Sequence, residues 1–157
     1  PYRDSLEFAL IDHAFRLDIP LFGGCRGMQI INVKKGGSLI IDLPSIRNTT
    51  IHQAEEGDAE HLLIDQGLSG FLSVQISTKI KVNSNHHQAI EQLAKGFEIL
   101  AVAQDSVIEA MVWKDTTNGP EIFCWQWHPE RMQRDNPFAS AVREYLVESI
   151  QSNSEKR

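Results

Sequence analysis

Cysteine is scarce in this sequence, which has two, Cys25 and Cys124, among 157 residues. Two thiols cannot build the disulfide framework of a small secreted domain, so we expect a reducing, cytoplasmic setting. Long apolar runs are lacking as well, since none approaches the roughly 18 residues that cross a bilayer. Residues 1–4 lead straight into a helical pattern, so no signal peptide is expected. We therefore expect no membrane partner.

Clustered basic residues are also lacking. The formal net charge is −6, and the basic residues occur as isolated pairs such as Lys34 with Lys35. A nucleic-acid surface needs grouped Lys and Arg, so nucleic acid is not expected as a partner. The composition that remains is globular, with 41% hydrophobic and 23% charged residues. Its length fits one domain over residues 1–157, with a frayed tail at 151–157.

The hydrophobic pattern predicts an α/β fold. Helical spacing predicts helices, and short apolar runs between turn residues predict strands. Helices are expected at residues 4–17, 28–33, 88–94 and 137–150, and strands at 19–22, 61–64, 79–82, 98–103, 107–113 and 121–127. A helix, a strand, a glycine turn and a second helix open the chain, which favours an α/β sheet. The later strands are joined by short turns, such as the one expected at 116–120, and favour an added antiparallel portion.

Two local patterns refine this prediction. In the first helix, Leu6, Leu10, Ala14 and Leu17 recur on one face, which predicts an amphipathic helix with that face apolar. Residues 42–58 are polar and have no clear period, which predicts a long surface loop.

The chemistry of the sequence centres on Gly23-Gly24-Cys25-Arg26-Gly27, between the first predicted strand and the second predicted helix. A nucleophile on such a turn needs small residues two positions before and after it, because strand and helix approach closely there. The turn presents the Cys25 side chain at the top of the sheet and aims the backbone N–H of Arg26 at a developing oxyanion. The helix N-terminus is expected to lower the pKa of the thiol. A buried structural cysteine is the alternative.

A cysteine nucleophile needs an imidazole base and a group that orients it. Trp127-His128-Pro129-Glu130 follows the last predicted strand, so His128 also lies at a strand end. Glu130 can accept one imidazole N–H while the other ring nitrogen faces Cys25. A strand-end histidine beside a solvated glutamate is the alternative, and the elbow at Cys25 weighs against it.

Residues 84–88 contain two adjacent histidines, His86 and His87. Adjacent side chains point apart on a strand or a helix, so the pair chelates a metal poorly. A metal site that combines either residue with His128 and Glu130 has no further ligand spacing to support it. We therefore expect this segment to form a polar pocket wall, and we expect no metal or other cofactor.

The remaining histidines and the second cysteine carry no pattern of their own. We interpret His13, His52 and His61 as incidental. Cys124 lies in an apolar strand beside Trp125, where a packed core thiol is expected.

Several segments resemble class I glutamine amidotransferases, in an order that spans almost the whole chain. Residues 20–29, with Asn32-Val33, 36–39 and 42–43 after them, resemble the elbow region of that superfamily. The motif Cys-Arg-Gly-Met-Gln at 25–29 resembles that of one branch, the γ-glutamyl-γ-aminobutyrate hydrolase-like proteins of the peptidase C26 family. Residues 82–90, 107–110 and 126–130 are similar to the second, third and fourth motifs of that branch.

The resemblance implies a flavodoxin-like mixed sheet flanked by helices and a catalytic triad of Cys25, His128 and Glu130. It implies a small-molecule γ-glutamyl amide as substrate, cleaved through a glutamyl thioester. It also implies a glutamyl pocket lined by Gln29, Ser84, His86 and His87. The leaving amine stays open between γ-aminobutyrate, a polyamine derivative and ammonia. A monomer and a homo-oligomer also both stay open.

The sequence departs from the family's pattern in two places. Family members carry a longer N-terminal region with the first sheet strands and a Gly-Gly-x-Asp loop, whose backbone N–H completes the oxyanion hole. Gly36 and Gly37 follow the elbow and cannot be that loop, and losing one such donor costs on the order of 3 kcal/mol. We therefore expect a C-terminal part of a larger protein, with an exposed sheet edge. Ser106 stands where the branch usually has Gly.

Two other functions stay open. One is a glutaminase module that hands ammonia to a synthetase partner, although no synthetase domain is present and Arg26 favours the free-standing hydrolase branch. The other is a non-catalytic module that binds a γ-glutamyl compound without turnover, which the retained Cys25, His128 and Glu130 argue against.

Overall fold

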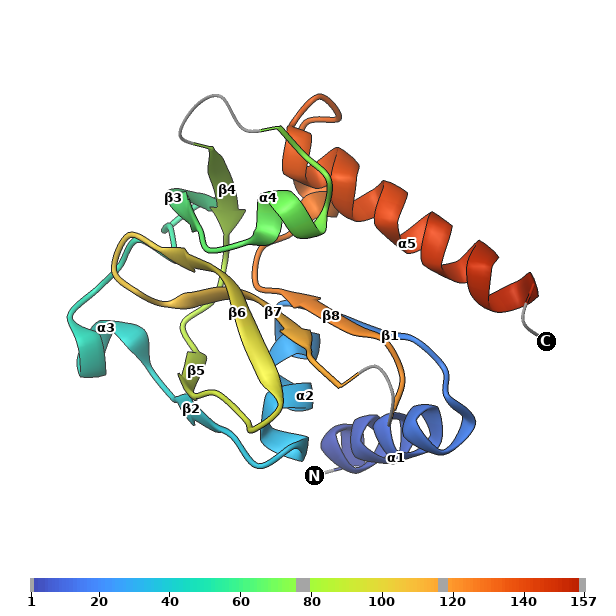
Figure 1. Ribbon diagram of the computed structural model, residues 1–157. Coiled ribbons are helices and arrows are strands. Elements are labelled where there is room, and N and C mark those ends of the chain that lie inside the picture. The colour runs from blue at the N-terminus through green and yellow to red at the C-terminus, as the bar shows by residue number, and fades with distance from the viewer. Residues whose placement is uncertain (1, 76–79, 116–118, 156–157) are drawn as a thin grey trace.

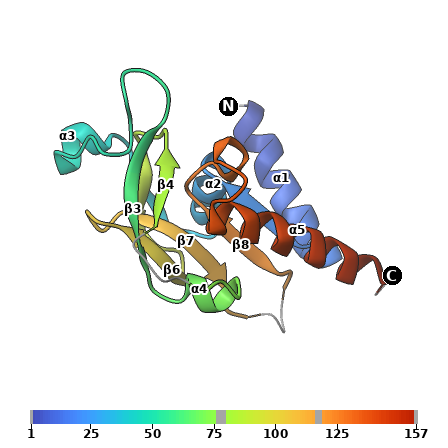
Figure 2. The same cartoon turned by 90° about the horizontal axis from the view of Figure 1, so that it is seen from above.

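The computed structural model describes residues 2–75, 80–115 and 119–155. These residues form a mixed sheet flanked by helices, seen from two directions in Figures 1 and 2. The sheet has the order β1 (Leu21–Gly24), β8 (Ile122–Trp125), β7 (Ile108–Trp113), β6 (Phe97–Ala103), β3 (Ala59–Asp65) and β4 (Lys81–Ser84). A separate ribbon pairs β2 (Ser38–Ile40) with β5 (Ala89–Gln92). The helices are α1 (Tyr2–Leu17), α2 (Arg26–Lys34), α3 (Leu43–Arg47), α4 (Leu68–Phe71), α5 (Pro137–Glu155) and the 3-10 helix η1 (Pro129–Arg131).

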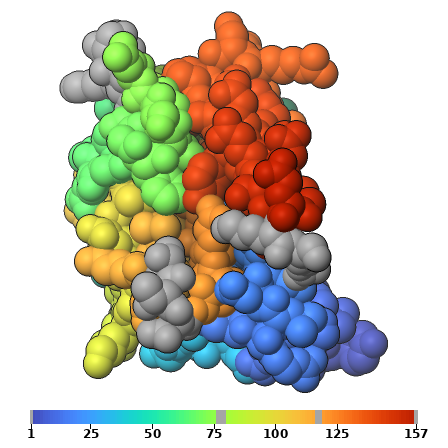
Figure 3. All heavy atoms as spheres, turned by 45° about the vertical axis from the view of Figure 1, so that its right-hand side comes forward, coloured from blue at the N-terminus to red at the C-terminus, as the bar shows by residue number. Residues whose placement is uncertain are grey.

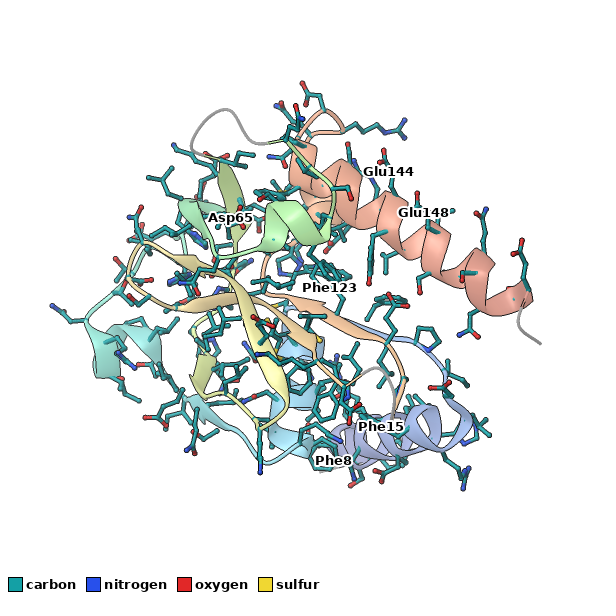
Figure 4. All side chains as sticks on the ribbon, in the orientation of Figure 1. Phe8, Phe15, Asp65, Phe123, Glu144 and Glu148 are labelled. Carbon is teal, nitrogen blue, oxygen red and sulfur yellow. The ribbon has the colours of Figure 1, made fainter. Side chains whose placement is uncertain are left out.

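The central strand β8 fills the core on both faces of the sheet. Ile122 and Cys124 pack in the core that α1 and α2 cover, whereas Phe123 and Trp125 pack in the core that α4 and α5 cover. Successive strand residues point to opposite faces, so one continuous apolar run supplies both cores. Figure 4 shows Phe123 on the side of the sheet where α4 and α5 lie. Cys124 is fully buried, which confirms the prediction of a packed core thiol.

Strand directions confirm the predicted mixture. β1 runs parallel to β8, whereas β7, β6, β3 and β4 join through antiparallel pairs. Within the described residues, β1 pairs on one side only and forms an edge of the sheet. Because β1 and β8 are parallel, their carboxyl ends lie at the same edge, where an α/β sheet commonly holds its functional residues.

The apolar face of α1 differs from the predicted one. Of the four residues predicted to form this face, Ala14 is buried, whereas Leu6, Leu10 and Leu17 are exposed; Ile11, outside that face, is buried. The helix packs through an aromatic stripe instead, because Phe8 and Phe15 lie against the core with Ile11 between them (Figure 4). Residues three and four apart share a helix face, so Phe8, Ile11 and Phe15 lie together on the side of α1 that packs against the core. α1 is the dark blue lower part of the surface in Figure 3.

Several predicted elements and boundaries are wrong. β1 covers Leu21–Gly24 and not 19–22, because Gly23 and Gly24 pair with β8. Residues 88–94 contain the strand β5 and not a helix, because Ile90 pairs with Leu39 of β2. The predicted loop at 42–58 contains α3, whose first turn is capped by an Asp42 carboxylate that accepts the Ser45 N–H at 3.2 Å. The terminal helix continues five residues past the predicted end at 150, to Glu155.

Some predictions reach beyond the described residues. Residue 79 of the predicted strand at 79–82 and residues 116–118 of the predicted turn at 116–120 lie outside them, as do residues 156 and 157 of the predicted tail. α4 was not predicted. Across the described ranges, no helix combines the length and apolar character that a membrane span requires.

Asn32 joins α2 to the small ribbon through a buried amide. Its Nδ2 donates to the carbonyl oxygens of Ser38 at 3.2 Å and Gln92 at 3.1 Å, and its Oδ1 accepts the Ala94 N–H at 2.8 Å. A Cβ on Gly37 would lie 2.3 Å from the Asn32 amide and 2.5 Å from the Gln92 oxygen. The glycine is therefore required for this close approach.

We predict that Asn32→Ala lowers the free energy of unfolding by about 3 kcal/mol, because it leaves buried backbone groups without partners. Urea denaturation followed by circular dichroism measures the change. The exposed Asn85 gives a matched control, and Asn85→Ala is expected to stay within about 0.5 kcal/mol of the parent. Equal losses in the two variants would contradict a special role for Asn32.

Candidate active site

Cys25 lies on a strained turn between β1 and α2. Its φ of 48° is in the left-handed region, which residues other than glycine rarely adopt. Its N–H donates to the Trp125 carbonyl oxygen at 2.8 Å, which extends the pairing of β1 with β8 into the turn. Strained backbone of this kind is concentrated at functional sites, where the surrounding structure holds it in place.

The tight approach of strand and helix accounts for one of the two predicted small residues. A Cβ on Gly23 would lie 2.7 Å from the backbone carbon of Gly27 and 2.8 Å from the backbone nitrogen of Met28. The prediction for Gly23 is therefore confirmed. For Gly27 it is wrong, because a Cβ there would meet no atom within 4 Å among the described residues.

His128 lies at the same edge of the sheet as Cys25. Gly24 is opposite Trp125 in the parallel pair, so Cys25 is level with Gln126 and His128 follows two residues later. The His128 N–H donates to Oδ1 of Asn83 at 3.0 Å, which fixes the backbone just after β8.

Glu130 holds the His128 ring. Nδ1 of His128 lies 2.8 Å from Oε1 of Glu130, and the His128 side chain is 15% exposed whereas that of Glu130 is 64% exposed. With Nδ1–H donated to the carboxylate, the lone pair remains on Nε2. The imidazole therefore has the tautomer that a general base on a thiol requires.

The electrostatic surroundings of Cys25 oppose ionisation. Burial raises the pKa of the Cys25 thiol above its usual value, and the negative charge of Glu109 raises it further. The backbone N–H of Arg26, the charge of Arg131 and the side chain of Gln126 lower it by less. The expectation of a lowered pKa at the start of α2 is therefore wrong, because desolvation outweighs the helix N-terminus. Cys25 needs a base to become a thiolate at neutral pH.

Gln126 is a site residue that sequence reasoning did not single out. It is fully buried, and its Oε1 accepts from Nε2 of Gln29 at 3.2 Å. Nε2 of Gln29 also donates to the carbonyl oxygen of Gln88 at 2.9 Å. Gln29 therefore contacts Gln126, whose side chain acts on Cys25. The sequence feature that could have indicated it is a polar glutamine directly after the apolar strand Ile122–Trp125.

The other predicted pocket residues lie differently. Ser84 and His86 are buried, whereas His87 is exposed. The Ser84 hydroxyl donates to the His52 carbonyl oxygen at 3.1 Å, and Nδ1 of His86 lies 2.8 Å from the Gln88 carbonyl oxygen. Ser84 and His86 therefore hold neighbouring backbone in place inside the protein and do not face solvent.

His52 and His61 are not incidental, contrary to the interpretation of the sequence. Both are buried against the carboxylate of Glu109, which is itself fully buried, and His86 completes the group. No sequence motif predicts this group, because its members come from separate parts of the sequence. His86 faces Glu109, whereas His128 faces Glu130, so the two histidines belong to different clusters.

A polar cavity of about 550 Å³ opens beside η1. It meets the site through Asn83, which holds the His128 backbone, and through Arg131, whose charge acts on Cys25. Nη1 of Arg131 donates to Oδ1 of Asp58 at 2.9 Å, which places charges of both signs on its wall.

Comparisons with known proteins identify the family of this chain. The Peptidase C26 family model matches residues 1–130. The chain is 37% identical over 135 residues to a Mycobacterium tuberculosis protein named "Putative glutamine amidotransferase Rv2859c", covering 86% of this chain and 43% of that protein. It is 30% identical over 140 residues to the gamma-glutamyl-gamma-aminobutyrate hydrolase of Escherichia coli O157:H7, covering 83% of this chain and 53% of the hydrolase.

Solved structures show the same fold. A glutamine amidotransferase from Thermotoga maritima superposes with a TM-score of 0.60 at 16% identity, covering 97% of this chain and 56% of that one. One from Methylobacillus flagellatus gives a TM-score of 0.59 at 22% identity, covering 94% and 50%. The fold is therefore the flavodoxin-like α/β fold of the class I glutamine amidotransferases. The chain spans about half the length of the proteins it matches.

We predict that iodoacetamide alkylates Cys25 with a pH midpoint above the pKa of about 8.5 of a free cysteine, because the thiolate is the reacting form and burial disfavours it. Arg131→Ala should raise the midpoint further by removing a positive charge, whereas the exposed Arg134→Ala should not move it. Mass spectrometry of the folded chain measures both rates, with the buried Cys124 unmodified. A midpoint below that of free cysteine would show an ion pair of Cys25 with His128 and contradict this prediction.

Proposed function

Because this chain belongs to the peptidase C26 family, we propose that it is a cysteine hydrolase that cleaves γ-glutamyl amide bonds. The observation that carries the proposal is the parallel pairing of β1 with β8, which puts Cys25 and the hydrogen-bonded pair of His128 and Glu130 at one edge of the sheet. A small-molecule γ-glutamyl compound is the proposed partner.

The first half-reaction forms a thioester. Nε2 of His128 takes the thiol proton of Cys25, a step made necessary by the raised pKa of the thiol. The sulphur attacks the γ-carbonyl carbon, and the backbone N–H of Arg26 donates to the oxyanion that forms. His128, held as imidazolium by Glu130, gives its proton to the amine as the C–N bond breaks.

The second half-reaction releases glutamate. His128 takes a proton from water, and the hydroxide attacks the thioester carbon of the glutamyl group. The C–S bond then breaks, and the imidazolium returns a proton to the sulphur of Cys25. The same three side chains therefore serve both halves, with the carboxylate of Glu130 keeping the ring in one orientation throughout.

The amide groups near Cys25 support a polar γ-glutamyl head group. Gln29 and Gln126 place side-chain amides beside the nucleophile, and the cavity beside η1 supplies charges of both signs. A glutamyl group carries an α-ammonium and an α-carboxylate, which such surroundings can pair. The relative from Escherichia coli O157:H7 has γ-aminobutyrate in its name, which supports that amine as the leaving group.

We predict that hydrolysis of γ-glutamyl-γ-aminobutyrate falls by about 10⁴ in kcat for Cys25→Ala and by a similar factor for His128→Asn, because each removes a member of one proton-transfer unit. Glu130→Gln should cost less than either, because it removes only the group that orients the imidazole. His13→Gln, on the exposed side of α1, is the control and should leave the rate unchanged. Release of γ-aminobutyrate measured by chromatography gives the rates.

Parallel assays with glutamine and γ-glutamyl-p-nitroanilide identify the leaving group. Turnover of glutamine alone would favour a glutaminase module. The assays use this chain and a version extended at its N-terminus to the length of its relatives. Activity in the extended version alone would place the second oxyanion donor in the added segment. Binding of a γ-glutamyl compound without turnover in either version would contradict the hydrolase and favour the non-catalytic module.

A further inference from the structure

Four buried side chains converge at a point that the proposed hydrolysis does not use. His52 comes from the segment between α3 and β3, His61 from β3, His86 from the segment after β4, and Glu109 from β7. Their side chains are 3% exposed or less. One nitrogen from each histidine and a carboxylate oxygen of Glu109 all lie within 4.8 Å of one another.

The distances from the Glu109 carboxylate to the three rings are close to those between ligands of a tetrahedral metal ion. Oε1 of Glu109 lies 3.6 Å from Nδ1 of His52, 3.3 Å from Nε2 of His61 and 3.7 Å from Nε2 of His86. Bonds of 2.0–2.1 Å to a tetrahedral zinc ion set neighbouring ligand atoms about 3.4 Å apart. The three distances from Glu109 exceed this spacing by at most a few tenths of an ångström, and the longer separations within the group, up to 4.8 Å, would have to close on binding.

The outer nitrogen of each ring faces a hydrogen-bond acceptor. Nε2 of His52 lies 3.0 Å from Oδ2 of Asp105, Nδ1 of His86 lies 2.8 Å from the Gln88 carbonyl oxygen, and Nδ1 of His61 lies 3.4 Å from its neighbour's carbonyl oxygen. A ring that donates its outer N–H presents a lone pair on the inner nitrogen. Metal-binding histidines are held in this way by carboxylates and backbone carbonyls.

Among the described residues, most of the inner atoms make no hydrogen bond of standard geometry; the exception is Nδ1 of His52, which lies 3.5 Å from the Ser84 hydroxyl. In the described part of the chain, Nε2 of His61, Nε2 of His86 and both carboxylate oxygens of Glu109 have no hydrogen-bond partner. His61 comes closest to Glu109, at 3.3 Å, but not with hydrogen-bond geometry. A buried carboxylate facing three lone pairs is costly unless a cation lies among them.

We propose that His52, His61, His86 and Glu109 bind one zinc ion. Two positive charges on the ion balance the carboxylates of Glu109 and Asp105, the second acting through the His52 ring. Imidazole and carboxylate ligands without a thiolate suit zinc. Four protein ligands leave no open position for water, so the ion stabilises structure and does not perform hydrolysis.

The zinc ion would fix the floor of the candidate active site. The Glu109 carbonyl oxygen accepts the Gln126 N–H at 2.8 Å, beside Cys25. The His86 ring is joined through the Gln88 carbonyl oxygen to Gln29. The ion thus ties β7 to the segments before β3 and after β4 and positions Gln29 and Gln126. It is independent of the proposed hydrolysis, because zinc binding requires no turnover.

Zinc titration against a chromogenic chelator tests the site. The chain is purified without a histidine tag and stripped of metal. One zinc ion per chain is expected, with a rise in melting temperature on addition. Glu109→Gln and His61→Gln should abolish stoichiometric binding, and Asp105→Asn should weaken it by roughly 10–100-fold. His13→Gln and Cys25→Ala should bind as the parent does. Loss of binding in Cys25→Ala, or none in the parent, overturns the proposal.

Cobalt substitution of the parent chain answers the same question without relying on buried variants that fail to fold. Intense visible absorption of a tetrahedral cobalt ion with nitrogen and oxygen ligands supports the site. Weak octahedral bands, or a charge-transfer band from thiolate to cobalt, overturn it, the latter by assigning the ion to Cys25. Cys25→Ala separates the two proposals, since it should lose hydrolysis and keep the metal.

Discussion

The parallel pairing of β1 with β8 is the constraint on which the rest of the site depends. Its register sets Gly24 opposite Trp125, and the Cys25 N–H continues the ladder to the Trp125 carbonyl oxygen. Both strands then end at one edge, where the chain turns sharply on one side and continues toward His128 on the other. A shift of one residue in this register would turn every side chain of β8 to the other face. The packing of Phe123 and Cys124 in opposite cores therefore also fixes where Cys25 lies relative to His128.

Burial has two opposite effects at this edge. It packs the strained turn at Cys25 against its neighbours, and the same burial raises the pKa of the Cys25 thiol, which disfavours the thiolate. In the proposed mechanism His128 offsets the second effect as a base, and its orientation is fixed by Glu130 and by the contact of its backbone to Asn83. Reactivity is thereby coupled to the presence of His128 and is not a permanent property of the thiol.

The sequence alone was sufficient for the α/β class, for the glycine turn at Cys25 and for the presence of an antiparallel portion, because each has a local signature. The helix predicted at 88–94 was wrong because pairing with β2 overrode a short ambiguous pattern. The prediction of the packed face of α1 was wrong because the helix has two apolar stripes and packs through the one that contains Phe8 and Phe15. The cluster around Glu109 could not be predicted, since His52, His61 and His86 meet only after three separate segments have folded against β7. The raised pKa of Cys25 likewise depends on the surrounding three-dimensional structure.

The large separation in sequence between β1 and β8 has a consequence for the order of folding. The hairpins of β6, β7 and β8 join neighbours along the chain, whereas Leu21–Gly24 must find Ile122–Trp125 across most of the sequence. Contacts between residues so far apart in sequence have a large entropic cost of loop closure and form slowly. A partly folded chain can hold most of its helices and hairpins while Cys25 and His128 are still far apart. Cys25 and His128, the proposed nucleophile and base, therefore meet only when this long-range strand pairing has closed.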